Sequence, residues 1–249
     1  MILVSHIAKT PEENLALDEV MLLSADKGLI GPTLRFWESN DIFVVLGRAC
    51  KHKDEVKLQS CSQDRIKVLR RISGGGTVLQ GPGCLNYSLV LPYDKDPEYA
   101  NINDSYHAVL GLISQGINVG AGYSDKVKKT NNVEIRGLSD ISINGLKFSG
   151  NAQARKKMFF LQHGTILYDF DITKIPLYLK HPPKEPEYRQ GRQHADFIKN
   201  ADINIADFKK ALSSIFNVKE QMSLDDDLTE KTRKLVEHKY LADTWNYSL

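Results

Sequence analysis

Three consecutive glycines, Gly74, Gly75 and Gly76, lie between two segments with the alternating apolar pattern of β-strands. Glycine has no Cβ atom, so such a run lets the backbone approach a ligand closely and permits positive φ angles. Ordering glycine has an entropic cost of roughly 0.5–1 kcal/mol per residue in regular structure. Arg70 and Arg71 precede the run directly and place two cations beside it. We therefore interpret this segment as a binding loop for a flat or anionic ligand rather than as a flexible surface turn.

A second constraint is the dipeptide Asn144-Gly145, the strongest two-residue signal for a tight β-hairpin. The predicted register pairs Asp140 with Ser149 and places both on one polar face with Lys147. The pattern thus brings a lysine and a carboxylate together on one surface. The opposite face would carry the apolar residues Ile141, Ile143, Leu146 and Phe148.

The other patterns predict strands that alternate with helices. Thr10-Pro11-Glu12-Glu13 contains a capping box and a proline at the first helical position, and Gly28 would end the helix that follows. Further strands are predicted at 33–38 and 42–47, joined as a hairpin, and at 66–70, 85–91 and 159–169. Further helices are predicted at 103–116, 171–179, 205–216 and 228–240. This order indicates an α+β (mixed α/β) fold with a helical C-terminal part from about residue 171.

Length and composition indicate an ordinary globular protein. The 249 residues are enough for one large domain with its own core, and the formal charge of +2 gives no reason to expect a nucleic-acid partner. No apolar run approaches the ~20 residues that span a bilayer, so no membrane association is expected. Neither a signal peptide nor a disulfide framework is visible, because the three cysteines show no CxxC spacing. We expect a cytoplasmic protein.

Several common sites are excluded by their spacing. The glycine run is not followed by the Gly-Lys-Ser/Thr of a nucleoside-triphosphate loop, and Leu79 stands where a dinucleotide fingerprint needs its third glycine. The sequence contains no HExxH and no Gly-x-Ser-x-Gly, so neither a zinc protease nor a simple serine hydrolase is expected. No metal site of protein origin is predicted.

What remains is a polar set in which arginines and open backbone amides suit a phosphate or carboxylate. Lys147 would stabilise the oxygen charge that develops in acyl transfer. Three ordered segments now carry a specific resemblance: residues 70–78 (RRISGGGTV), 147–153 (KFSGNAQ) and 163–167 (HGTIL). With Asn14–Glu19, Leu34–Trp37 and Gly47-Arg48, they are similar to the lipoate–protein ligase A family over residues 10 to about 170.

The resemblance implies the class II synthetase-like fold of biotin and lipoate ligases, a mixed, mostly antiparallel sheet flanked by helices. It implies a single catalytic domain over residues 1–249 without the C-terminal accessory domain of longer ligases, so that a separate small subunit is an expected partner. It also implies that lipoate or octanoate is activated with ATP and Mg²⁺, which enters with the nucleotide. The acyl group would pass to a lysine of a lipoyl domain, of the glycine cleavage H protein or the 2-oxoacid dehydrogenase E2 type.

By matching position, Lys147 would hold the carbonyl and phosphate oxygens of the acyl adenylate. The resemblance also implies a larger set of residues around substrate and adenylate. These are Arg70, Arg71, Ser73, Gly74, Gly75, Gly76, Thr77, Gln80, Asn86, Asp140, Ser149, Gly150, Ala152, His163, Gly164 and Thr165.

Two alternatives are considered. Gln80-Gly81-Pro82-Gly83 resembles the sister octanoyltransferases, which move an acyl group between carrier proteins without ATP and use a cysteine nucleophile. Both usual cysteine positions are empty, because residues 133–146 and 167–183 contain none, which leaves Cys84 as the candidate; such a lone cysteine is more often a small buried apolar residue. An acyl-binding protein without catalysis would lack a site lysine, and Lys147 argues against it.

Overall fold

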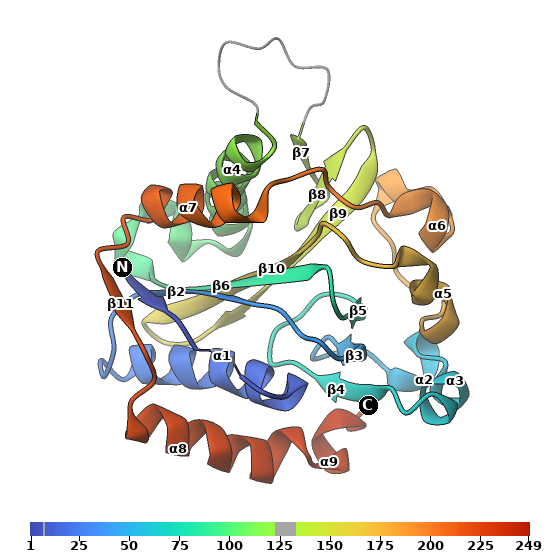
Figure 1. Cartoon of the computed structure of the whole chain (residues 1–249), viewed down its shortest axis with the longest axis horizontal. Coiled ribbons are helices and arrows are strands. Elements are labelled where there is room, and N and C mark those ends of the chain that lie inside the picture. Colours follow the sequence, from blue (N-terminus) through green and yellow to red (C-terminus); the bar gives the residue numbers. More distant parts are fainter. Residues whose placement is uncertain (7, 123–132) are drawn as a thin grey trace.

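The computed structural model describes residues 1–6, 8–122 and 133–249, which form a large mixed sheet and a small sheet between helices (Figure 1). The large sheet has eight strands in the order β11-β1-β2-β6-β10-β9-β8-β7. Strand β1 pairs in parallel with β11 and β2, and the other pairs are antiparallel. The strands are β1 (Ile2–Val4), β2 (Thr33–Trp37), β6 (Cys84–Pro92), β7 (Val133–Arg136), β8 (Asp140–Ile143), β9 (Leu146–Arg155), β10 (Phe159–Leu167) and β11 (Glu220–Met222).

The small sheet has three strands in the order β4-β3-β5 and delivers the glycine run. Strand β3 pairs in parallel with β4 and antiparallel with β5. The run itself is the connection from β4 to β5. These strands are β3 (Phe43–Leu46), β4 (Lys67–Arg70) and β5 (Val78–Gln80).

Helices cover both faces of the large sheet (Figure 1). On one face α4 (Ile102–Gly120) and α7 (Ile205–Ile215) pack over the largest apolar cluster, and on the other α1 (Pro11–Asp26) packs over a second cluster, with α8 (Asp226–Leu235) against it. The shorter helices are α2 (His52–Glu55), α3 (Leu58–Gln63), α5 (Ile175–Tyr178), α6 (His194–Phe197) and α9 (Asp243–Asn246). Within the described residues, no helix is long and apolar enough to cross a membrane.

The start of α1 forms as its sequence predicts. The Thr10 side chain accepts from the Glu13 amide, and the Glu13 carboxylate accepts from the Thr10 amide, which completes the capping box. The helix ends before Gly28, whose φ of +73° is the left-handed conformation that favours glycine. This helix is buried along most of its length, so its polar residues face the interior as well.

The lysine hairpin forms at Asn144-Gly145, but a β-bulge changes its register. Ser142 pairs with Lys147 as expected, whereas Asp140 pairs with Gly150 and not with Ser149. Phe148 is the extra residue on β9 and belongs to the apolar cluster under α4. The predicted shared face of Asp140, Lys147 and Ser149 was therefore wrong for Ser149, because the period of two breaks at the bulge.

Other boundaries also differ from the sequence pattern. The predicted hairpin of residues 33–38 and 42–47 is wrong, because β2 belongs to the large sheet and β3 to the small one. Asn101, and not residue 103, caps α4, since its side chain accepts from the amides of Asn103 and Asp104. The C-terminal part contains helices α5 to α9 joined by irregular segments, and its strand β11 extends the large sheet beside β1. The predicted mixed fold with flanking helices is confirmed.

We expect Gly83 to be a packing requirement of this fold. A Cβ atom there would lie 2.2 Å from the backbone carbonyl carbon of Asp169, and its φ is +83°. Gly83→Ala should therefore lower the free energy of unfolding by at least about 3 kcal/mol in urea titrations. Gly28 is the matched control, because its φ is also positive but no atom lies within 4 Å of the added Cβ. Gly28→Ala should cost only about 1 kcal/mol, and equal losses would contradict this account.

Candidate active site

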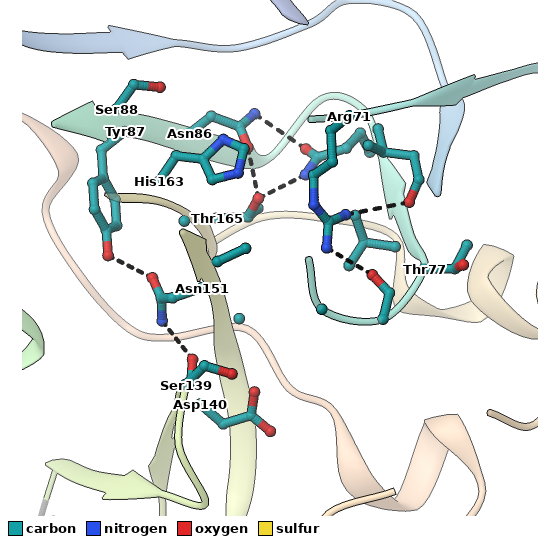
Figure 2. Close-up of a pocket in the computed structure, with 18 of the residues that line it drawn as sticks. Arg71, Thr77, Asn86, Tyr87, Ser88, Ser139, Asp140, Asn151, His163 and Thr165 are labelled. Carbon is teal, nitrogen blue, oxygen red and sulfur yellow. Dashed lines mark hydrogen bonds between the residues drawn. The ribbon is translucent and has the colours of Figure 1, made fainter. Parts of the chain in front are cut away.

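A cavity of about 130 Å³ lies where the two sheets meet, on the α1 side of the large sheet. Its walls come from α1, β2, β3, the glycine run, β6, β9 and β10, so distant parts of the chain build it together. Figure 2 shows the polar side chains that line it. We call it the first cavity. Predicted site residues on its wall are Arg71, Gly75, Gly76, Thr77, Gln80, Asn86, Asp140, Lys147, Gly150, Ala152, His163, Gly164 and Thr165.

A second cavity of about 270 Å³ adjoins the first at the lysine hairpin. Its outer wall is formed by α5, α6 and the proline-rich segment 180–189. The boundary that both cavities share includes Gly76, Thr77, Gln80, Asp140, Lys147, Gly150 and Thr165. Lys147 thus lies on the wall that the two cavities share.

Lys147 is held by an ion pair at this boundary. Its Nζ lies 2.7 Å from Asp140 Oδ1, and its side chain is 27% exposed, so it remains accessible from the cavities. Gly150 leaves the space through which the lysine passes, since a Cβ there would lie 3.2 Å from Lys147 Nζ. The bulge in β9 is what places Gly150, rather than Ser149, opposite Asp140.

The buried Arg71 side chain holds the glycine run through hydrogen bonds. Its guanidinium donates to the Ser73 hydroxyl and to the carbonyls of Gly74 and Gly76, at 2.6–3.2 Å. Gly75 has a φ of +81°, and a Cβ there would lie 2.9 Å from Arg71 Nη2. The glycines therefore let the loop wrap around a buried cation, so that the carbonyls of Gly74 and Gly76 face the Arg71 guanidinium.

Arg70 does not line either cavity. Its guanidinium is fully buried and donates to the carbonyls of Gly47, Arg48 and Cys50 on one side and to those of Trp245 and Asn246 on the other. The 47–50 turn in turn holds the glycine run, because the Arg48 amide donates to the Ser73 carbonyl at 2.8 Å. Arg70 thus links the C-terminal segment to the loop rather than contacting a ligand.

His163 is fixed by a buried polar chain that the sequence interpretation missed. Its Nε2 lies 2.5 Å from Ser73 Oγ, and its Nδ1 lies 3.5 Å from Asp18 Oδ2. Asp18 also pairs with Arg35 at 3.0 Å and accepts from Ser88 at 2.7 Å. Burial alone would raise the pKa of Asp18, but these partners lower it below its usual value.

The signal for this chain was present in the sequence. Asp18 and Arg35 both lie in segments that resemble the family, Asn14–Glu19 and Leu34–Trp37. A carboxylate on an otherwise buried helix needs a charged partner, and Arg35 on β2 supplies it. Ser73, which was assigned to ligand binding, is fully buried and serves here as the partner of His163 and Arg71.

Gln80, Asn86 and Thr165 form a closed ring of hydrogen bonds. Gln80 donates to Thr165, Thr165 donates to the Asn86 carbonyl oxygen, and Asn86 donates to Gln80, at 2.6, 2.6 and 3.1 Å (Figure 2). The ring ties β5, β6 and β10 together beside the cavity. It explains why a glutamine at position 80 is compatible with this site.

Ser149 and Gly164 lie beside a hydrogen-bond network around Asn151. Ser149 is buried and accepts a hydrogen bond from Asn151 at 3.3 Å. Gly164 makes room for the same network, since a Cβ there would lie 1.8 Å from Asn151 Oδ1 and 2.9 Å from the Tyr87 ring. Tyr87 donates to Asn151 at 2.5 Å, as Figure 2 shows.

None of the three cysteines lines either cavity. All three are free and buried, and burial raises the pKa of Cys84 to about 12 and of Cys61 to about 11. Burial is also the main reason why the pKa of Cys50 is raised. A thiol needs a lowered pKa to act as a nucleophile, so Cys84 is a buried apolar residue, as the sequence interpretation favoured.

The site has the features that an anionic ligand requires. Gly74 and Gly76 have open space where a Cβ would stand, so the loop surface admits a close ligand. Thr77 borders both cavities beside Lys147. The Lys147 ammonium suits a phosphate or carboxylate oxygen at the junction.

The site thus combines a lysine–carboxylate pair between two cavities with a glycine loop, and no cysteine lines either cavity. The family model described as the lipoyl protein ligase A/B catalytic domain matches residues 10–225, and the chain belongs to this family. It is therefore an enzyme of the lipoate ligase and octanoyltransferase group, as its sequence resemblance indicated.

The relatives include proteins named octanoyltransferase and proteins named lipoate-protein ligase. Octanoyltransferase LipM of Clostridioides difficile is 30% identical over 249 residues, which cover 91% of this chain and 90% of that protein. A probable lipoate-protein ligase A of Mycoplasma pneumoniae is 34% identical over 170 residues, which cover 68% of this chain and 46% of that protein. A bi-partite lipoate protein ligase from Thermoplasma acidophilum, solved in a study of its archaeal lipoylation system, superposes with a TM-score of 0.81 at 23% identity. That match covers 100% of this chain and 96% of the other and establishes the fold alone.

We expect Arg70 to stabilise the loop without touching a ligand. Arg70→Lys cannot serve five carbonyls, so it should lower the free energy of unfolding by about 2–4 kcal/mol. Hydrogen exchange should accelerate both at residues 47–50 and at the C-terminal residues 243–249. Arg233→Lys is the control, because Arg233 is exposed on α8 and pairs with Glu230 and Glu237 of the same helical region. Unchanged exchange at the C-terminal residues would contradict the proposed link.

Proposed function

We propose that the chain is a lipoate–protein ligase that activates lipoate or octanoate with ATP and transfers the acyl group to a lipoyl-domain lysine. The observation that carries the proposal is the junction itself: Lys147 borders both cavities, and no thiol lies at either. An enzyme without a nucleophile at the junction needs another way to activate a carboxylate. Adenylation with ATP provides one, because AMP is a good leaving group.

The two cavities suit the two halves of such an intermediate. The first cavity is lined at its inner part by Leu15, Trp37 and Val45 and suits the acyl chain. The second cavity is larger and borders the glycine run, and it suits the nucleotide. The carbonyl carbon and the α-phosphate would then meet at Lys147, which borders both cavities.

In the first step the substrate carboxylate oxygen attacks the α-phosphorus of ATP, and pyrophosphate leaves. Lys147 would stabilise the charge on the phosphate and carbonyl oxygens through its ammonium group. In the second step the acceptor lysine amine attacks the acyl carbon, its proton is lost to solvent, and AMP leaves. Mg²⁺ would enter with the nucleotide and neutralise phosphate charge, and among the described residues no cluster of three His, Cys, Asp or Glu side chains offers a separate metal site.

The partners follow from the reaction. We propose acceptors of the glycine cleavage H protein or 2-oxoacid dehydrogenase E2 type, because the Thermoplasma acidophilum ligase was studied together with its E2 lipoyl domain. That ligase is bi-partite, so a separate small subunit is proposed here as well. We also propose a cytoplasmic location, since three unpaired cysteines suit a reducing compartment.

The second candidate is an ATP-independent octanoyltransferase, which the name of the Clostridioides difficile relative favours. It would take an octanoyl group from a carrier protein through a thioester on the enzyme. The buried thiols argue against it, because burial raises the pKa of Cys84 to about 12 and keeps the thiolate from forming. We therefore place the ligase first.

ATP–pyrophosphate exchange tests the first step. The purified chain should catalyse exchange only when lipoate or octanoate is present, and Lys147→Ala should reduce the rate by about 100-fold or more. Lys174→Ala is the matched control, because Lys174 lies outside both cavities and pairs with Asp171 on the surface. Full exchange in a folded Lys147→Ala protein would exclude the role of Lys147. Absence of exchange together with octanoyl transfer from a carrier protein without ATP would instead favour the second candidate.

A further inference from the structure

The segment 185–199, which we call the strap, contains α6 and packs against β9 of the lysine hairpin (Figure 1). The Lys199 amide donates to the Lys147 carbonyl at 2.9 Å, and Ile198 forms a parallel bridge with Lys147. At the hairpin turn, Arg192 Nη2 donates to the Gly145 carbonyl at 3.1 Å. The strap is thus fixed both at the turn and at the backbone of Lys147.

A third contact of the strap is made to Asp140, the ion-pair partner of Lys147. The Tyr188 hydroxyl donates to Asp140 Oδ2 at 2.9 Å, while Asp140 Oδ1 lies 2.7 Å from Lys147 Nζ. Tyr188 and Lys147 therefore each bind a different oxygen of the Asp140 carboxylate. Burial and the nearby Asp140 raise the pKa of Tyr188, so its hydroxyl keeps the proton that it donates.

Tyr188 is itself held in place. Its ring lies 5.1 Å from the ring of Phe197, which is 2% exposed, and its carbonyl accepts from Arg192 at 2.8 Å. Arg189 and Arg192 stack over the Phe197 ring at 4.8 and 5.1 Å. The hydroxyl is therefore presented by an ordered cluster rather than by a free side chain.

The Asp140 carboxylate needs a hydrogen-bond partner of this kind to fix its direction. It is the first residue of β8 and pairs with Gly150, which has no side chain to limit the carboxylate. The terminal torsion of an aspartate is broad, so a second hydrogen bond is what fixes the direction of Oδ1. The preceding residue, Ser139, is held through its backbone, because its carbonyl accepts from Asn151 at 2.8 Å. That contact fixes the start of β8 but leaves the direction of the Asp140 side chain to Lys147 and Tyr188.

We propose that Tyr188 is a positioning residue of the acyl-activation site: its hydroxyl orients Asp140, and Asp140 holds Lys147 Nζ at the junction of the cavities. The inference rests on the proposed function, because it concerns the placement of the lysine in that reaction. It connects a proline-rich excursion to the chemistry of a hairpin more than thirty positions earlier in the chain.

A double-mutant cycle tests it with Tyr188→Phe, Asp140→Asn and the double variant. Tyr188→Phe keeps the ring on Phe197 and removes only the hydroxyl, so kcat should fall about tenfold with KM for the acid little changed. Because Tyr188 acts through Asp140, the double variant should be no slower than Asp140→Asn. Tyr168→Phe is the matched control, since the Tyr168 hydroxyl also donates to a carboxylate, that of Glu38 at 2.9 Å, away from both cavities.

Additive losses in the double variant, or a rise in KM without a change in kcat, would overturn the proposal. If Tyr188→Phe does not fold, Phe197→Leu replaces it, because this change loosens the Tyr188 ring but keeps the hydroxyl. The same lack of additivity with Asp140→Asn is then expected.

An NMR measurement that needs no catalytic turnover tests the role of Tyr188 independently of the proposed function. The ¹H–¹⁵N signal of the Lys147 ammonium, assigned by its loss in Lys147→Arg, should shift or broaden in Tyr188→Phe and stay unchanged in Tyr168→Phe. An unchanged signal in Tyr188→Phe would overturn the positioning role. If the wild-type chain transfers octanoate without ATP, the proposed function fails, and the cycle is measured on that transfer instead.

Discussion

The ion pair between Lys147 and Asp140 depends on a single irregularity in the large sheet. The bulge at Phe148 lets that ring enter the core under α4 while Lys147 stays on the cavity side with Gly150. Without the extra residue, the period of two would send either the phenylalanine or the cavity-facing residues beyond it to the wrong face. The bulge therefore allows Phe148 to pack in the core while the charged Lys147 side chain lies at the junction of the two cavities.

Around this pair, three buried arginines form hydrogen bonds to the segments that build the site. Arg71 is enclosed by the carbonyls of the glycine run, Arg70 by those of the 47–50 turn and the C-terminal segment, and Arg35 by Asp18 and Asn14. Buried cations are costly unless they are fully hydrogen-bonded, so each fixes the segments that satisfy it. In this way three arginines define the shape of the loop and the orientation of His163, and Arg71 also lines the first cavity.

Much of this arrangement could be predicted from the sequence, and the exceptions have physical causes. Local signals were sufficient for the capping box at Thr10, the turn at Asn144-Gly145 and the strand with His163 and Thr165 on one face. The bulge has no reliable local signal, because it depends on whether Phe148 finds space in the core. For the same reason Ser149 was placed on the wrong face.

Long-range contacts account for the other differences. Arg70 and Arg71 look equivalent in the sequence, and they differ because the 47–50 turn and the C-terminal segment supply carbonyls to Arg70. The separation of β2 and β3 into two sheets likewise depends on β4 and β5, with which β3 pairs. The role of Tyr188 could not be predicted, since the proline-rich excursion has no periodic pattern that links it to the hairpin.

The central claim is that this site activates a carboxylate as an adenylate and not as a thioester. Mass spectrometry after a single turnover with octanoate and ATP tests it most directly, because it measures both the protein and the bound small molecules. The account predicts octanoyl-AMP together with unmodified protein. A protein heavier by one octanoyl group that is released by hydroxylamine, formed from an octanoyl carrier protein without ATP, would contradict it.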